Sequence, residues 1–69
     1  MKRKPVTSSN LASIGYDEKS GTLEVEFHSG SVYQYFDVPA RVHRELMAAG
    51  SHGQYFSTSI RTKFRYAKV

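Results

Sequence analysis

The chain has 69 residues, no cysteine and a formal net charge of +4. Its length allows at most one domain, because domains usually run to about 100–200 residues. The absence of cysteine excludes disulfide cross-links and zinc sites built from cysteine thiolates. With 39% hydrophobic and 13% aromatic residues, the composition also excludes a disordered tail.

The first residues are polar and basic, and we expect a flexible basic arm over residues 1–5. A single domain is expected over residues 6–69. Its first strand is predicted where Ala12, Ile14 and Tyr16 recur at every second position and so share one face.

The clearest strand signal is at residues 22–28, where apolar and polar side chains alternate. Leu23, Val25 and Phe27 form the apolar face of this strand. A Ser-Gly turn follows, and residues 32–36 are rich in residues that favour β-structure. The three strands together predict an antiparallel meander.

The loop between the second and third strands decides which face two tyrosines occupy. A two- or four-residue loop pairs Phe27 with Val32 and puts Tyr33 and Tyr35 on the polar face. A three-residue loop that ends at Gly30 puts both tyrosines on the apolar face. We favour the three-residue loop, because glycine suits its last position and buried tyrosines would help to fill a small core.

Two short helices are predicted after the strands, at residues 39–49 and 52–61. Gly50 ends the first helix, and Ser51 is positioned to cap the second. Residues 62–69 are read as a short strand or an extended strap. The predicted fold is therefore α+β: a three-stranded antiparallel meander followed by two short helices that pack on one face. An SH3-like or OB-like small barrel is the alternative if the last segment adds a strand.

An ordered series of motifs runs along most of the chain. It consists of SSNLASIGYD at 8–17, LEVEF at 23–27, GSVYQY at 30–35, VP at 38–39, Leu46, Gly53, YF at 55–56 and IR at 60–61. This series, over about residues 6 to 66, resembles the KTSC domain family, whose central mark is a Tyr-x-Tyr motif. The family is named for its place at the C-terminus of some lysyl-tRNA synthetases, and it also occurs as free-standing bacterial proteins. The resemblance implies no established activity, and RNA binding is a suggested function of the family.

The tyrosines of this motif, Tyr33 and Tyr35, have two interpretations. They could form a platform for unpaired bases, since each stacked base contributes about 1–3 kcal/mol. The interpretation that we favour is that they are core residues or cross-strand pairs, because the chain has few large aliphatic residues to fill a core. Glu24 and Glu26 would repel phosphate if they shared the face of the tyrosines.

The positive charge lies at the two ends of the chain. Residues 1–4 carry +3 and residues 61–69 carry +4, whereas residues 5–60 carry −3. The C-terminal end interleaves cations with aromatic residues: Arg61, Lys63, Phe64, Arg65, Tyr66 and Lys68. Such a segment can bind phosphates and stack bases, and the alternative is a solvated strap that closes the core. Arg41 and Arg44 on the first helix could extend this basic patch.

Neither metal chemistry nor catalysis has a sequence signal in this chain. His28, His43 and His52 lack the spacing of metal ligands, and there is no nucleophile elbow or glycine-rich phosphate loop. We therefore expect no cofactor and a nonenzymatic, cytoplasmic module that binds RNA, tRNA or other single-stranded nucleic acid. The alternative function is a protein–protein interaction or assembly module. No apolar run is long enough to span a membrane, so no membrane partner is expected.

Overall fold

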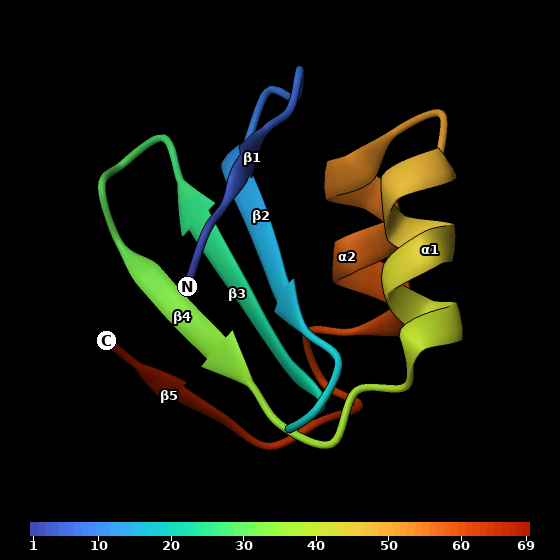
Figure 1. Ribbon diagram of the computed structural model, residues 1–69. Helices are drawn as coiled ribbons and strands as arrows, with labels where there is room; N and C mark the ends of the chain where they lie inside the picture. The colour runs from blue at the N-terminus through green and yellow to red at the C-terminus, as the bar shows by residue number, and fades with distance from the viewer.

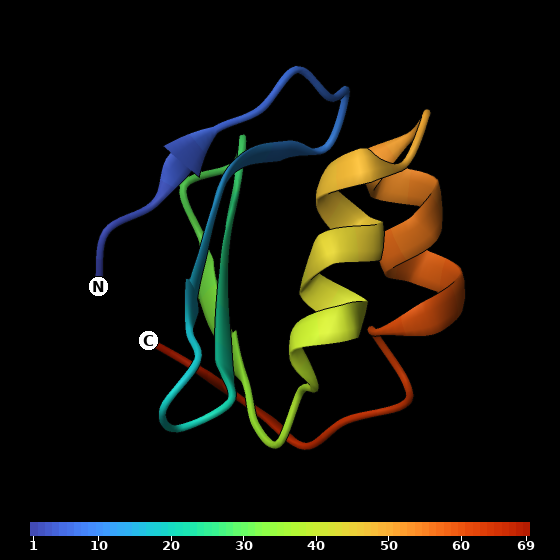
Figure 2. The same cartoon turned by 45° about the vertical axis from the view of Figure 1, so that its right-hand side comes forward.

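The computed structural model, which describes residues 1–69, contains a five-stranded antiparallel sheet and two helices (Figure 1). The elements in chain order are β1 (Lys4–Pro5), β2 (Leu11–Asp17), β3 (Thr22–Phe27), β4 (Val32–Tyr35), α1 (Ala40–Ala48), α2 (His52–Ser59) and β5 (Tyr66–Lys68). The strands follow one another across the sheet in sequence order. Both helices cover the same face of the sheet, as Figure 2 shows. The architecture is that of a small α+β domain.

The sheet has two strands more than the predicted meander. β2, β3 and β4 are the meander, and β1 and β5 add one short strand at each edge. Lys4 pairs with Ile14 at one edge, and Tyr66 pairs with Tyr35 at the other. β1 has no alternation in the sequence, whereas β5 confirms the short strand that was one of the two readings of residues 62–69. Both strands form because an existing sheet edge offers backbone partners. Because β1 and β5 lie at opposite edges, the sheet stays open and does not close into an SH3-like or OB-like barrel.

Residues 1–5, expected to be a flexible arm, lie against the sheet in the structure. Lys4 and Pro5 pair with β2, and the Arg3 side chain reaches Glu24 on β3. Gly15 allows this approach, because a Cβ atom there would lie 2.6 Å from the carbonyl oxygen of Lys2. In Figure 2 this segment lies on the side of the sheet away from the helices.

The start of β2 departs from the predicted alternation. The pairing with β3 shifts between Leu11 and Ser13, which is the mark of a β-bulge. The bulge puts Leu11 on the core face with Ile14, with exposed fractions of 0% and 2%. Ala12, predicted to share the face of Ile14, is only half-buried. A bulge inserts one extra residue, so strict alternation placed this end of the strand wrongly.

The β3–β4 register confirms the three-residue loop. Gly30 adopts a left-handed φ of 97°, which glycine tolerates without strain. Val25 pairs with Tyr33, and Leu23 pairs with Tyr35. Directly paired residues project from the same face, so both tyrosines lie on the face that the helices cover.

The two helices begin and end within two residues of their predicted bounds. α1 turns Val42 and Leu46 inward, four residues apart. The Ser51 hydroxyl caps α2 by accepting a hydrogen bond from the Gln54 amide. Neither helix has the length and apolar character needed to cross a membrane.

The hydrophobic core lies between the sheet and the helices. Its buried residues are Leu11, Ile14, Leu23, Val25, Tyr35, Val38, Val42, Leu46, Phe56 and Ile60. The core thus joins all three meander strands to both helices, and the edge strands contribute no buried residue to it. This arrangement leaves the β4–β5 edge of the helix-side face open for a site.

Candidate nucleic-acid interface

An open groove of about 860 Å³ lies between the sheet, α2 and the C-terminal segment. We call it the aromatic groove, after the six aromatic residues in its lining: Phe27, Tyr33, Tyr35, Phe56, Phe64 and Tyr66. Hydroxyl and amide side chains complete much of the wall: Ser9, Asn10, Ser29, Ser31, Ser57 and Thr62. Arg61 and His28 also line it, and no aspartate or glutamate does. The groove therefore combines aromatic surface, hydrogen-bonding groups and a cation.

The floor of the groove is a cluster of mutually packed rings. Tyr35 has an exposed fraction of 4%, with its ring centroid 5.3 Å from that of Phe56 and 5.6 Å from that of Tyr66. Tyr33 packs its ring against Phe27 at 5.8 Å, edge to face. Burial, followed by the nearby Tyr33 and Tyr66, raises the pKa of Tyr35. Tyr35 is thus a core residue, and Tyr33 is a half-buried residue of the groove floor.

Tyr66 offers the most accessible aromatic surface of the groove. Its exposed fraction is 59%, and it stands opposite Tyr35 on the neighbouring strand. Lys68 stands opposite Tyr33, so it projects from the same face of the sheet as Tyr66. An unpaired base could stack on the Tyr66 ring with a cation two residues away.

The C-terminal segment, residues 61–68, holds three cations that have no acidic partner: Arg61, Lys63 and Lys68. The fourth cation, Arg65, makes a 2.8 Å ion pair with Asp37 and lies 5.8 Å from the centre of the Phe36 ring. That pair is exposed to water and therefore weak. The C-terminal segment therefore places net positive charge beside the groove.

The acidic residues of β3 lie on the opposite face of the sheet. Glu24 accepts hydrogen bonds from Arg3 and from Gln34, the latter at 2.8 Å. The Ser13 hydroxyl donates to Glu26 at 2.8 Å. The Gln34 hydrogen bond, together with Arg3, holds the pKa of Glu24 below its ordinary value, although burial acts the other way. These carboxylates therefore do not face the groove, and the repulsion considered from the sequence does not apply to it.

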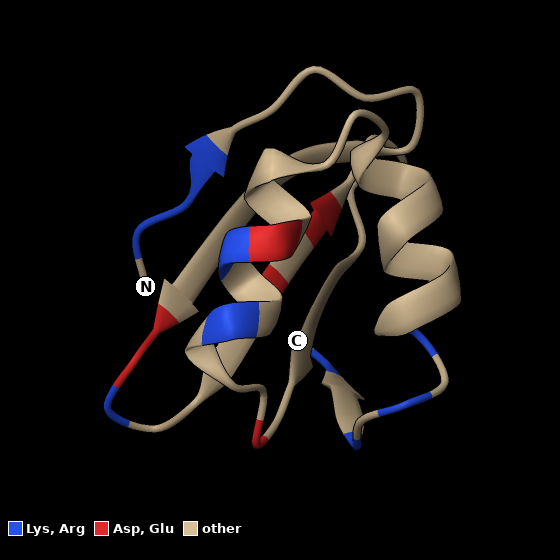
Figure 3. Cartoon of the chain, turned by 90° about the vertical axis from the view of Figure 1, so that its right-hand side faces the viewer, with Lys and Arg blue, Asp and Glu red and all other residues tan.

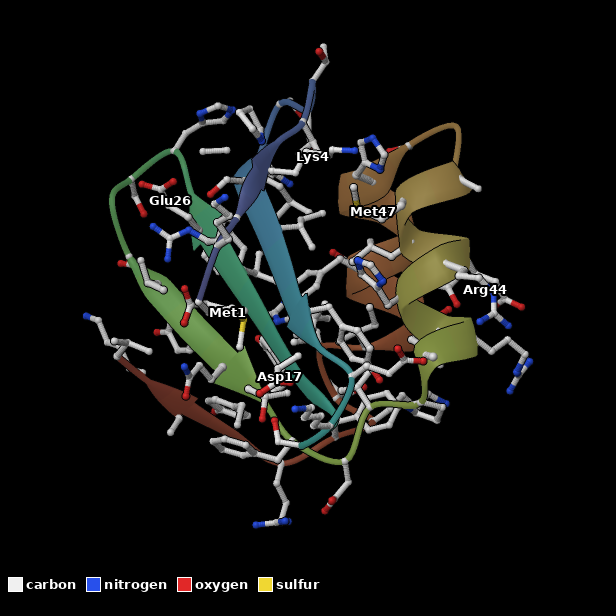
Figure 4. All side chains as sticks on the ribbon, in the orientation of Figure 1. Met1, Lys4, Asp17, Glu26, Arg44 and Met47 are labelled. Atoms are coloured by element: carbon white, nitrogen blue, oxygen red, sulfur yellow. The ribbon has the colours of Figure 1, made fainter.

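The cations of α1 are not brought to the groove. Arg41 lies 3.5 Å from Glu45, one helical turn further on, and Arg44 points away from the sheet (Figure 4). Glu45 also accepts a hydrogen bond from Tyr55, which raises the pKa of that tyrosine. Figure 3 shows the α1 cations and the C-terminal cations as two separate groups. The single basic patch considered from the sequence is therefore divided in two.

The histidines have structural environments that differ from one another. The His28 and His52 rings each lie within hydrogen-bonding distance of a backbone carbonyl, at 2.7 and 2.8 Å. His43 stacks on Tyr16 with the ring centroids 4.7 Å apart, and burial lowers its pKa. No three His, Cys, Asp or Glu side chains gather in a way that could hold a metal ion.

Sequence reasoning identified one wall of the groove and missed the other. The C-terminal aromatics Phe64 and Tyr66 were candidates, and so were the floor tyrosines. Phe27 and Phe56 were read only as strand and helix core residues, and their rings lie 5.6 Å apart in the structure. No local sequence pattern predicts this contact, because Phe27 and Phe56 are far apart in the chain.

The family of the chain follows from comparison with known proteins. Residues 7–64 match the KTSC domain. The chain belongs to the KTSC domain family. A crystal structure of a KTSC domain protein from Yersinia pestis has a TM-score of 0.94 against this domain and is 43% identical to it. That similarity covers 99% of this chain and 96% of the other.

Curated relatives of this KTSC domain include both short and long proteins. An uncharacterized protein of Stutzerimonas stutzeri is 41% identical over 100% of this chain and 99% of its own length. Lysine–tRNA ligases of Nostoc punctiforme and Trichormus variabilis are 43% and 50% identical over 86% and 78% of this chain. The match spans only 10% of the length of each ligase.

Proposed function

We propose that this KTSC domain is a nonenzymatic module that binds unpaired nucleic acid, RNA or tRNA in particular. The observation that carries the proposal is the aromatic groove, which has no carboxylate in its lining and three unpartnered cations in or near it. The aromatic groove and the C-terminal segment together would form the binding surface.

The chemistry of the surface fits a single strand better than a duplex. Unpaired bases can lie on aromatic rings, whereas bases in a helix are already stacked on one another. Arg61, Lys63 and Lys68 would neutralise phosphates and release condensed counterions. The hydroxyl and amide groups of the wall can bond to sugars or base edges.

The relatives support the same kind of ligand. Lysine–tRNA ligases, by their name, act on tRNA, and a tenth of their length resembles this domain. A small accessory domain that contacts RNA would suit such a protein. The proposal for this chain still rests on its own groove.

A fluorescence-anisotropy titration with tRNA and with a labelled six-nucleotide oligouridylate tests the proposal. With three or four phosphate contacts, the slope of log affinity against log salt should be about −2 to −3 for a single strand. Replacing both Arg61 and Lys63 by alanine should weaken binding and make the slope less steep by about one to two. Absence of binding at low salt, or affinity that ignores salt, would refute the proposal.

A second candidate function is a protein-interaction or assembly module, and the free edge of β5 favours it. β5 is the last strand of the sheet, so its outer N–H and C=O groups have no strand partner. An extended segment of another protein could pair with this edge by strand addition. Sedimentation across a range of concentrations tests self-assembly, and a strictly monomeric protein would count against it.

A further inference from the structure

A second hollow adjoins the aromatic groove. Its volume is about 520 Å³, and it shares Thr62, Phe64 and Tyr66 with the groove. Because these three residues line both hollows, they lie between the two. We call this neighbour the second hollow.

Apart from the residues that they share, each hollow has aromatic and cationic side chains of its own. Phe36, Lys63 and Arg65 line only the second hollow. Arg61 and Tyr33 are among the residues that line only the aromatic groove. Both hollows are open to solvent, and the second hollow is the shallower of the two. Neither lining contains a carboxylate. Both adjoining hollows thus offer aromatic surface and positive charge.

We propose that this KTSC domain binds at least two consecutive unpaired nucleotides, one base in the aromatic groove and its neighbour in the second hollow. Phe64 and Tyr66 would lie between the two bases. The inference rests on the proposed function and deepens it, because it defines the smallest ligand that fills the site.

Charge and spacing argue for a polynucleotide as the occupant. Arg61, Lys63 and Arg65 follow one another at every second residue in an exposed segment. A strand that repeats one base and one phosphate per unit suits a surface on which two adjoining hollows both have rings and cations. The exposed Asp37 carboxylate that pairs with Arg65 can give way to a phosphate at little cost, since exposed ion pairs are weak.

A competition experiment with short ligands tests the two-base arrangement. A labelled six-nucleotide oligouridylate serves as the probe, and the competitors are uridine monophosphate and the 5′-phosphorylated uridine dinucleotide. The second stacked base should make the dinucleotide bind about 5- to 150-fold more tightly than the mononucleotide. A gain below about threefold would overturn the two-base arrangement.

Variants of the second hollow locate this gain. Phe36→Ala should remove most of the dinucleotide advantage and leave the affinity for the mononucleotide nearly unchanged. Lys63→Ala, at an exposed residue, should also reduce the dinucleotide advantage, and it serves in case the loss of the half-buried Phe36 ring prevents folding. Arg61→Ala should weaken both ligands, because it acts in the groove that holds the first base.

Lys4→Ala is the matched control, because it removes the same charge far from the site. Lys4 lies in β1 at the sheet edge opposite β5, as Figure 4 shows. This variant should keep the full dinucleotide advantage.

The two proposals fail in different ways. If the six-nucleotide probe does not bind at low salt, the proposed function is refuted and the inference falls with it. If the probe binds but both competitors displace it equally, and Phe36→Ala and Lys63→Ala change nothing, the inference alone is overturned.

Discussion

The contact between Arg3 and Glu24 predicts that the N-terminal segment stabilises the fold. The Glu24 side chain is 8% exposed and the Arg3 side chain is 28% exposed, so the ion pair is largely shielded from water. The Arg3 Nε group also donates to the Ser13 hydroxyl at 2.9 Å. Arg3→Met keeps the aliphatic stem and removes all of these donors.

The structure sets the expected size of the effect. Hydrogen bonds to a charged group contribute about 1.5–3 kcal/mol to the free energy of unfolding. Gln34 still donates to Glu24 in the variant, so the carboxylate is not left alone. The loss of stability should therefore be smaller than the cost of breaking a fully buried ion pair, which is about 3–5 kcal/mol. In a domain of this size, a loss of about 1.5–3 kcal/mol lowers Tm by about 6–24 °C.

Urea unfolding followed by circular dichroism measures the effect in a double-mutant cycle. The cycle uses Arg3→Met, Glu24→Gln and the double variant, and we expect a coupling energy of about 1–2 kcal/mol. Lys2→Met, at an exposed neighbour, should change stability by less than about 0.5 kcal/mol. A coupling energy below about 0.5 kcal/mol would show that the N-terminal segment is not docked as described.

The same pair has a pH signature. The Gln34 hydrogen bond and Arg3 lower the pKa of Glu24 in the folded state, so folding favours the ionised carboxylate. The stabilisation is complete above the unfolded pKa of about 4.3 and is lost as pH falls through the lower folded value. The coupling should accordingly be present at pH 7 and should vanish in acid.

Three further changes test other parts of the structure. Gly15→Ala should destabilise the fold by about 1–3 kcal/mol, because its Cβ would lie 2.6 Å from the Lys2 carbonyl oxygen, and an unchanged Tm would contradict this approach. Leu46→Ala removes a fully buried side chain and should cost about 2–5 kcal/mol in urea unfolding, whereas a cost below about 1 kcal/mol would place Leu46 outside the core. Burial, with a smaller contribution from Arg44, lowers the pKa of His43 in the folded state, so its contribution to stability is complete above the unfolded pKa of about 6.5 and declines as pH falls below it. His43→Gln should reduce the change of the urea midpoint between pH 7.5 and 5.5. If the midpoint of the variant changes with pH as much as that of the parent, His43 is not the source of the pH dependence.

The meander and the helices could be predicted because their signals are local. Leu23 and Val25 mark one face of β3 by simple alternation, and Gly30 indicates the three-residue loop that sets the β4 register. Ser51 indicates the start of α2 through its capping hydroxyl. Each of these signals lies within a few residues of the structure that it predicts.

The candidate site could be predicted only in part. The C-terminal cations and Tyr66 were visible as a basic, aromatic segment. Their place beside Tyr33 depends on β5 pairing with β4, and the other wall depends on how α2 packs over the sheet. The position of Glu24 behind the sheet depends on the same register that turns the tyrosines inward.

The sequence by itself determined the α+β composition, the meander, the two helices and the concentration of positive charge at the chain ends. Only the tertiary structure decided the edge strands, the bulge at Leu11, the docking of Arg3 on Glu24 and the pair of hollows divided by Phe64 and Tyr66. The physical reason is the range of the interactions. Periodicity, turns and caps act between near neighbours in the chain, whereas edge pairing and a groove wall arise from backbone and side-chain partners that meet only after the core has packed.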